Sequence, residues 1–292
     1  MPTALLLLVL LPFAAQTTHS KSFWASIAQQ KFALPAGEAA APLAAELVAL
    51  LGSTDPVMRD DLAYAILTSW IHTQKLLSPE EVRSISRTLQ ANLKRGIAGP
   101  QSDQVLLRSF SALTLSAIAA RDNAEPFLAP GEYHTLLESA LTYFRDERDV
   151  RGFDGTKGWM HSAAHTADLL KFVARNAKLR TSDQARILAA LTAKNREATV
   201  PFAQGEDERM ARVVISIVRR ADFDRTAFTV WLADAQATAA FPKQPTVTAL
   251  RAQQNVRHLL SSLFSSLTAD ERPSDGADFA RTSVREALKT LY

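Results

Sequence analysis

Apolar residues recur at helical spacing along almost the whole chain, and this periodicity is the feature that most limits its fold. Leu62, Ile66 and Trp70 follow one another at intervals of four, so a helix would place them in one apolar stripe. Similar stripes occur in residues 102–121 and 205–218. Valine and isoleucine lie within these stripes and not in alternating apolar and polar runs, which would indicate strands. The pattern therefore predicts an all-α protein of about eleven or twelve helices, without a convincing strand.

The expected helices are roughly 12–20 residues long with short connections, which is typical of stacked antiparallel helical pairs. Such pairs form either a HEAT-like α-solenoid or a compact helical bundle, and no exact repeat period favours one of them. Pro242 and Pro245 mark the best internal break. We therefore expect an all-helical domain in residues 21–241 and a C-terminal helical cap in residues 242–292. The last three predicted helices are Arg225–Ala239, Val247–Leu267 and Ala277–Leu291.

Local signals predict several helix boundaries. Ser78-Pro79 is typical of a helix start, with serine as the N-cap and proline in the first turn. The acidic run after Gly205 predicts another start, since carboxylates suit the positive end of the helix dipole. Thr181-Ser182-Asp183 predicts a cap for a helix over residues 184–194. An earlier helix is expected over about residues 158–176.

Composition excludes several classes of protein. The 33 lysines and arginines nearly balance the 30 acidic residues, and the net charge is +3. No block of basic residues interleaved with aromatic ones occurs, so we expect no nucleic-acid partner. The chain has no cysteine, which excludes disulfides, thiolate metal sites and a cysteine nucleophile.

Residues 1–20 have the features of a secretory signal peptide. Ala4–Leu11 is an unbroken apolar run that ends at Pro12 and is followed by small residues. The run is too short to span a bilayer, and no later segment reaches the roughly 18 consecutive apolar residues of a membrane span. We therefore expect cleavage near Ala15 or Ser20 and a periplasmic or secreted mature protein. The alternative is a buried N-terminal helix.

Polar, aromatic and glycine residues are concentrated in one segment, residues 146–170. Three of the ten glycines and two of the six histidines of the chain fall within it. Glycine permits turns and close backbone approach, whereas histidine supplies acid–base and metal-binding groups. The candidate residues of this segment are Asp149, Arg151, Asp154, Trp159, His161, His165 and Asp168.

Motifs in and around this segment carry a resemblance to a known family. They are Arg59-Asp60-x-Leu62-Ala63-Tyr64, Arg108-Ser109-Phe110, Asp149-x-Arg151-Gly152-Phe153, Gly158-Trp159-x-His161-Ser162-Ala163-Ala164-His165-x-Ala167-Asp168 and Gly205-Glu206-Asp207-Glu208-Arg209. In order and spacing they resemble an uncharacterised bacterial family, domain of unknown function 2785. The resemblance covers roughly residues 40–220, and the run that ends at Asp168 is its most specific part. It implies an all-helical fold and a bacterial origin, and it supplies no activity.

His161 and His165 are the first candidates for chemistry. On one helix they lie a turn apart, separated by about 40° of rotation, and two imidazoles at this spacing can share a metal ion such as zinc. Asp168 would lie about 10 Å along the axis from His161, so it fits better as a residue that orients His165 or pairs helices. The alternative is that both histidines are hydrogen-bonded parts of the frame. Possible third ligands are Asp149, Asp154, Glu206, Asp207 and Glu208.

The other candidates also have two interpretations. Arg151 either grips an anionic ligand group or pairs with a neighbouring carboxylate to pin the loop. Trp159 either lines a ligand pocket or packs in the core. Glu206 and Asp207 either begin a helix or reach across to the histidines. Arg108-Ser109 and Asp60 are expected to act as buried polar struts.

Two functional hypotheses follow. The first is an exported helical-repeat protein that binds a protein or small-molecule ligand, or acts as a scaffold, through a polar groove around residues 149–168. The second is a metal-dependent, hydrolase-like enzyme that uses His161 and His165, with Asp149 as a further catalytic candidate. Convergence of three ligands around an open position would favour the enzyme, whereas buried and hydrogen-bonded imidazoles would favour the scaffold.

Overall fold

Helices make up most of the computed structural model, which describes residues 19–272 and 274–291. Within those residues the chain forms twelve α-helices, and π-helical turns, η1 and η2, extend α3 at both ends. The all-α prediction is therefore confirmed. The helices are, in chain order, α1 (Lys21–Gln29), α2 (Ala40–Leu50), η1 (Val57–Tyr64), α3 (Ala65–Thr68), η2 (Ser69–Thr73), α4 (Pro79–Asn92), α5 (Gln104–Ala124), α6 (Pro130–Asp146), α7 (Ser162–Arg175), α8 (Thr181–Glu197), α9 (Glu206–Val218), α10 (Arg225–Ala239), α11 (Val247–Thr268) and α12 (Asp275–Lys289).

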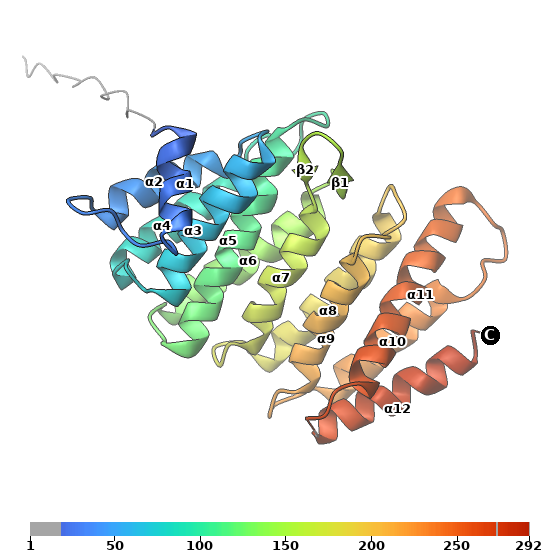
Figure 1. Ribbon diagram of the computed structural model, residues 1–292. Helices are drawn as coiled ribbons and strands as arrows, with labels where there is room; N and C mark the ends of the chain where they lie inside the picture. The colour runs from blue at the N-terminus through green and yellow to red at the C-terminus, as the bar shows by residue number, and fades with distance from the viewer. Residues whose placement is uncertain (1–18, 273, 292) are drawn as a thin grey trace, which may run out of the picture.

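The helices stack in two layers, as Figure 1 shows. In one layer α5 packs against α7, α7 against α9, and α9 against α11. In the other layer α6 packs against α8, α8 against α10, and α10 against α12. Contacts of α4 with α5, α6 with α7 and α10 with α11 join the two layers. The C-terminal helices continue the stack, since α11 packs on α8, α9, α10 and α12.

The apolar stripes form the core between the layers. Leu62, Ile66 and Trp70 are all buried, as their spacing predicts. Fully burying a side chain of this size contributes roughly 1.5–3 kcal/mol. Buried residues from α1 through α12 belong to one hydrophobic cluster, so the stack shares a continuous core.

A two-stranded hairpin is the main departure from the predicted elements. β1 (Phe153–Asp154) pairs antiparallel with β2 (Gly158–Trp159), and Phe153 lies opposite Trp159. The prediction of a helix over residues 158–176 is therefore wrong at its start, because α7 begins at Ser162. Two-residue strands are too short to leave an alternating pattern, so hydrophobic periodicity does not reveal them.

Capping chemistry explains where helices begin. The Ser78 hydroxyl accepts a hydrogen bond from the Glu81 N–H, and the Glu81 carboxylate accepts one from the Ser78 N–H. The predicted serine cap of α4 is therefore confirmed. The predicted cap at residues 181–183 is wrong, because α8 begins at Thr181 and Arg180 is its N-cap residue. Asp183 lies inside the first turn and pairs with the Arg180 side chain at 2.8 Å.

The predicted leader lies outside the described residues, except for His19 and Ser20. The Ser20 hydroxyl accepts a hydrogen bond from the Phe23 N–H and caps the start of α1. Cleavage near Ala15 or Ser20 stays a prediction. Of the helices in the described ranges, none combines the length and the apolar character that crossing a bilayer requires.

Candidate functional site

Residues 147–161 form a loop and hairpin at one edge of the stack (Figure 1). Two glycines allow this segment to pack closely against its neighbours. Gly158 has a φ of +71°, and a Cβ there would lie 2.9 Å from the Pro56 Cβ. A Cβ on Gly152 would lie 1.4 Å from the Gln204 side-chain oxygen, which accepts a hydrogen bond from the next N–H of the chain. These two glycines therefore let the hairpin dock against η1 and against the segment before α9.

Arg59 anchors the hairpin to the N-terminal part of the stack. Its side chain is fully buried in η1, and its guanidinium lies 4.7 Å from the centre of the Phe110 ring. Nη2 donates hydrogen bonds to the carbonyl oxygens of Lys157 at 2.7 Å and Trp159 at 3.3 Å. Nε lies 2.7 Å from the Asp60 carboxylate. Burial raises the pKa of Asp60 to about 6, although the adjacent guanidinium favours the ionised form.

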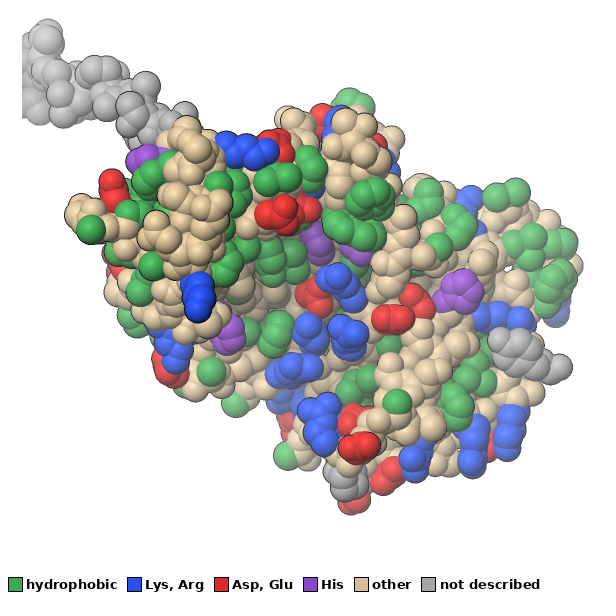
Figure 2. Space-filling view, in the orientation of Figure 1, with side chains coloured by type: hydrophobic (Ala, Val, Ile, Leu, Met, Phe, Trp, Pro, Cys, Tyr) green, Lys and Arg blue, Asp and Glu red, His purple; other side chains and the backbone are tan. Residues whose placement is uncertain are grey.

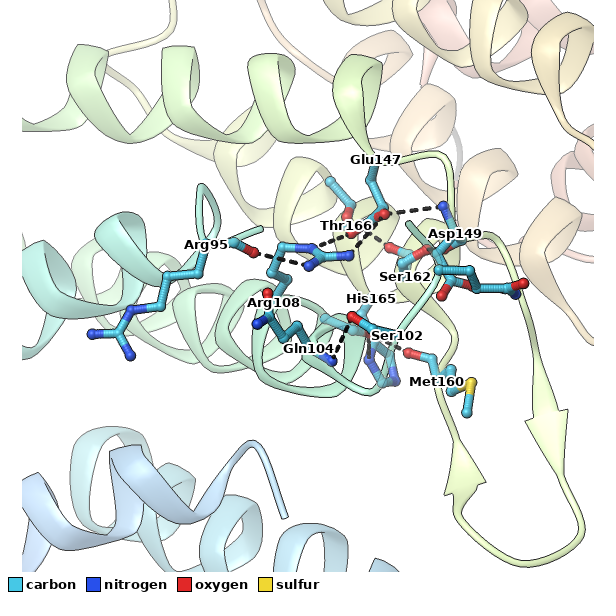
Figure 3. Close-up of polar contacts among 12 residues, drawn as sticks. Arg95, Ser102, Gln104, Arg108, Glu147, Asp149, Met160, Ser162, His165 and Thr166 are labelled. Carbon is cyan, nitrogen blue, oxygen red and sulfur yellow. Dashed lines mark hydrogen bonds and ion pairs between the residues drawn. The ribbon is translucent and has the colours of Figure 1, made fainter. Parts of the chain in front are cut away.

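A buried ion pair holds the other end of the loop (Figure 3). Arg108 Nε and Nη2 donate to the two carboxylate oxygens of Glu147 at 2.5 and 3.1 Å. Arg108 also donates to the Arg95 carbonyl oxygen, and Glu147 accepts from the Asp149 N–H. The Ser162 hydroxyl donates to the Asp149 carbonyl oxygen at 2.5 Å. The prediction that Arg108 is a buried strut is therefore confirmed. The pair ties α5 to the end of α6, and the Ser162 hydroxyl ties the loop to the start of α7.

His161 and His165 lie next to each other, yet only His165 belongs to the helix. His161 is the N-cap residue of α7, with a left-handed backbone at φ +49°. Its ring stacks on Trp159 with centroids 4.6 Å apart, and the two imidazole centroids are 5.6 Å apart. Both histidines are buried, at 3% and 4% exposed. The prediction that both share one face of a helix is therefore wrong, although the two side chains do come together.

Each imidazole has a partner within the protein. His161 Nε2 lies 3.3 Å from Glu206 Oε1 at the start of α9. Burial alone would raise the pKa of the Glu206 carboxyl, but His161 and a backbone N–H hold that pKa below its usual value. The Ser109 hydroxyl donates to the Met160 carbonyl oxygen, so its oxygen is left to accept from His165 Nδ1–H at 2.8 Å. In this tautomer His165 is not a base toward Ser109.

Acidic pH should destabilise the protein through His165. Burial, followed by the electrostatic influence of His161 and of nearby arginines, holds the pKa of His165 well below the usual histidine value. Below about pH 6.5 the unfolded chain therefore binds a proton that the folded protein does not, and stability falls with pH. We expect the stability advantage of the wild type over His165→Gln to shrink by about 2 kcal/mol from pH 7 to pH 5.

Chemical denaturation at a series of pH values measures this difference. Asp60 acts in the opposite direction, since its raised pKa of about 6 makes the folded protein bind the extra proton. Subtracting the stability of His165→Gln from that of the wild type at each pH removes the Asp60 contribution, because both proteins contain Asp60. His258→Gln, at a partly exposed histidine, is the matched control. A difference that stays constant from pH 7 to pH 5 would contradict the assignment of His165 as a neutral buried group.

Asp149 and Arg151 pair with each other. Arg151 Nε lies 2.8 Å from Asp149 Oδ1, and Nη2 lies 2.5 Å from Oδ2. Nη2 also donates to the Ser102 carbonyl oxygen, so Arg151 pins the loop to the start of α5. Asp154 accepts hydrogen bonds from two N–H groups of the hairpin turn. Asp149 also accepts from the Arg151 N–H, so both acids hold local backbone, and within the described residues neither carboxylate pairs with an imidazole.

Asp168 does not orient His165, contrary to that interpretation of its position. Its carboxylate pairs with Lys171 Nζ at 2.9 Å and with the Arg209 guanidinium. Because Arg209 belongs to α9, Asp168 acts as a helix-pairing residue between α7 and α9. Helix pairing is the second of the two interpretations that its distance along the helix axis favours over metal binding.

The acids proposed as third metal ligands do not converge on the two histidines. Glu206 approaches His161, whereas Asp207 accepts a hydrogen bond from the Ser262 hydroxyl, and Glu208 is exposed. Across residues 19–272 and 274–291, no group of three or more His, Asp or Glu side chains is arranged to hold a metal ion.

A cavity of about 370 Å³ borders the loop beside Asp149 and Arg151. Glu147 and residues 99–101 and 199–200 also line it. The cavity contains side chains of both signs of charge, which already pair with one another. Of residues 149–168 only Asp149, Val150 and Arg151 line this cavity, so the predicted groove around the whole segment stays a prediction.

Sequence reasoning missed three side chains that hold the site, namely Arg59, Glu147 and Gln204. Arg59 precedes Leu62 by three positions and so falls on the apolar stripe of its helix. A charged residue on a buried stripe is the signal that points to a buried polar strut. Nothing in its spacing indicates that its partner is a hairpin, because the Trp159 carbonyl oxygen lies 100 residues farther along the chain.

A family model described as protein of unknown function (DUF2785) matches residues 93–265, which is more than half of the 292 residues. The motifs predict the same family over roughly residues 40–220. The match begins later than they do, just after α4, and extends into α11. No curated protein and no solved structure matches the chain significantly.

Proposed function

We propose that this chain, which belongs to the family of proteins of unknown function DUF2785, is a helical-repeat binding module that holds another protein through the hairpin of residues 153–159. Membership of the family supplies no activity, so the proposal rests on the site itself. We also propose that the module is exported to the periplasm or secreted, because residues 1–20 have the features of a signal peptide.

The observation that carries the proposal is the exposure of two large aromatic rings on the hairpin. Phe153 is 55% exposed and Trp159 is 38% exposed, and the two rings meet edge to face at 5.0 Å between centroids. Aromatic side chains gain much free energy from burial, and exposed clusters of them are typical of protein contact sites. At protein interfaces a few residues often supply most of the binding energy, and Trp is among the most frequent of them.

The hairpin is held from several directions, which favours tight association. Arg59 binds its carbonyl oxygens, Gln204 accepts a hydrogen bond from its first strand, and Lys157 Nζ lies 2.7 Å from the Asp103 carboxylate. A surface that is fixed in advance loses less conformational freedom on binding than a mobile loop does.

The histidines fit a supporting role better than an enzymatic one. His161 stacks on Trp159, and His165 is hydrogen-bonded to Ser109 in α5. Both are buried, and the Ser109 proton is donated to a carbonyl oxygen, so these residues offer no general base beside a free hydroxyl. The hydrolase hypothesis therefore lacks the open, convergent site that it requires.

Charged side chains beside the aromatic pair indicate the kind of partner that would fit. Lys157 and Asp103 pair at the surface, and the Asp154 carboxylate is partly exposed in the same turn. An apolar centre with a polar rim is the usual arrangement of a protein–protein interface. A polypeptide that places an apolar side chain on the two rings and polar groups at the rim would match it.

Site-specific photo-crosslinking in the producing cell tests this proposal. Benzoylphenylalanine at position 153 should give one discrete adduct of higher mass. The same amino acid at position 241 is the matched control, because Phe241 is 69% exposed and lies between α10 and α11. Trp159→Ala should reduce the adduct at position 153 about tenfold or more, which corresponds to about 1.4 kcal/mol of binding free energy.

Three results would contradict the proposal. They are folded protein with no adduct at position 153, the same adduct at positions 153 and 241, and an adduct that Trp159→Ala leaves unchanged. Trp159 is partly exposed, so its replacement should reduce stability by only about 1 kcal/mol and leave the protein folded for the comparison.

A further inference from the structure

A second, strongly basic pocket lies where α7 and α9 end, whereas the hairpin site lies where these two helices begin. This basic pocket has a volume of about 650 Å³. The face drawn in Figure 2 carries many Lys and Arg side chains across its middle and lower part, with Asp and Glu side chains among them. Its charged and polar lining consists of Arg175, Ser216, Arg219, Arg220, Asp222 and Arg272.

Arg220 belongs to the frame of the basic pocket. Nη1 donates to the carbonyl oxygens of Ala174 and Asn176 at 2.9 and 2.8 Å, and Nη2 donates to that of Leu179 at 3.1 Å. Nε lies 2.7 Å from the Asp222 carboxylate. The guanidinium is therefore fully used in joining the end of α9 to the connection between α7 and α8.

Arg175, Arg219 and Arg272 keep donors that the protein does not use. Arg175 Nε donates to the Ser216 hydroxyl at 3.0 Å, and its terminal nitrogens have no acceptor in the described part of the chain. Arg219 pairs with Asp270 through Nη2, while its buried Nε has no hydrogen-bond partner there. Arg272 reaches the same aspartate through Nε at 3.3 Å. The terminal nitrogens of Arg175 and of the exposed Arg272 therefore keep charged N–H groups that a ligand can reach, whereas the Arg219 Nε is buried.

The positive charge of the basic pocket exceeds the negative charge near it. Four arginines line the pocket, and the acids beside them are Asp222 and Asp270. Desolvation at the pocket wall and the positive charge of Arg272 lower the pKa of Arg175. Desolvation and the charges of Arg272 and Arg175 lower the pKa of Arg219 in the same way. Like charges held this close repel each other, and a bound anion would relieve that repulsion.

We propose that the basic pocket binds a small oxyanion with two or more negative charges, either a phosphorylated compound or a polycarboxylate. Arg175 is the main ligand-binding residue, because its two terminal nitrogens can donate two parallel hydrogen bonds to phosphate or carboxylate. Arg219 adds the N–H groups of Nη1, since its Nη2 is held by Asp270 and the Arg272 carbonyl oxygen. Ser216 positions Arg175 through the hydrogen bond to Nε. A volume of about 650 Å³ lies within the usual range for small-molecule sites. This inference is independent of the hairpin proposal.

Calorimetric titration of the full chain with pyrophosphate and with citrate, at a constant ionic strength of about 0.15 M, tests this inference. We expect one-site, saturable binding of at least one probe with a Kd below about 1 mM. The preferred probe distinguishes a phosphorylated ligand from a polycarboxylate. Arg175→Gln should weaken binding about tenfold or more. Arg87→Gln, at an exposed arginine of α4, should leave the Kd within about twofold.

Variants without ligand supply a second readout. Arg175→Gln removes one of the repelling charges, so its melting temperature should equal or exceed that of the wild type. Arg175→Lys keeps the charge but lacks the planar fork, so it should stay folded and bind more weakly than the wild type. Saturable binding of neither probe would overturn the inference. Equal weakening by Arg175→Gln and Arg87→Gln, or unchanged affinity in folded Arg175→Gln, would overturn it as well.

Discussion

Arg108→Met should lower the free energy of unfolding by about 3–5 kcal/mol, because it leaves Glu147 as an unpaired charge in the protein interior. The two side chains are each 4% exposed, and two hydrogen bonds of 2.5 and 3.1 Å join them. The Arg95 carbonyl oxygen after α4 also loses its donor. Denaturation with guanidinium chloride measures the loss as a lower midpoint, while the dependence of the unfolding free energy on denaturant concentration stays the same.

Two further variants separate the ion pair from general damage. Arg108→Met/Glu147→Leu should recover most of the loss, since replacing both buried partners by apolar side chains is often nearly neutral. Recovery will be incomplete, because Glu147 also accepts the Asp149 N–H at 3.0 Å. Arg87→Met removes an exposed pair and should change stability by less than about 0.5 kcal/mol. Equal losses from Arg108→Met and Arg87→Met would refute the role of the ion pair.

Helical periodicity predicts the fold well because each helix buries one face, and burial repeats at a fixed spacing in the sequence. The predicted helix over Arg225–Ala239 has the same limits in the structure. The start of α4 is equally predictable from the sequence, since Ser78 and Glu81, only three positions apart, accept hydrogen bonds from each other's backbone N–H groups. Interactions of this kind are local, so the residues that form them are also neighbours in the sequence.

The candidate site is harder to predict because its partners are distant in the sequence. Ser109, which binds the His165 ring, lies 56 residues before it. The four-residue spacing of His161 and His165 suggests one helix face, but the backbone of His161 is left-handed, so α7 begins only after it, at Ser162. Backbone dihedrals at a non-glycine residue leave no mark in hydrophobic periodicity. Asp168 is a further example, since it pairs with Arg209 of α9, 41 residues farther along the chain, whereas Asp149 pairs with Arg151 only two residues away.

Arg59→Met should lower the free energy of unfolding by about 3–5 kcal/mol and release the hairpin from the stack. The guanidinium is fully buried and donates to the carbonyl oxygens of Ser53 at 2.8 Å, Lys157 at 2.7 Å and Trp159 at 3.3 Å. Its removal leaves these acceptors without a donor and leaves Asp60 without its counter-ion. Because the same side chain serves the core and the hairpin, stability and binding should fall together.

Hydrogen exchange distinguishes release of the hairpin from a uniform loss of stability. The N–H groups of Met160 and His161 donate to the carbonyl oxygens of Gly152 and Arg151, and they should lose protection in Arg59→Met beyond the global change. The photo-crosslink from position 153 should weaken in parallel. Arg148→Met is the matched control, since Arg148 lies in the same loop and its exposed side chain pairs with Glu197 of α8. If Arg59→Met loses stability while these two N–H groups keep their relative protection, Arg59 stabilises the core alone and does not hold the hairpin.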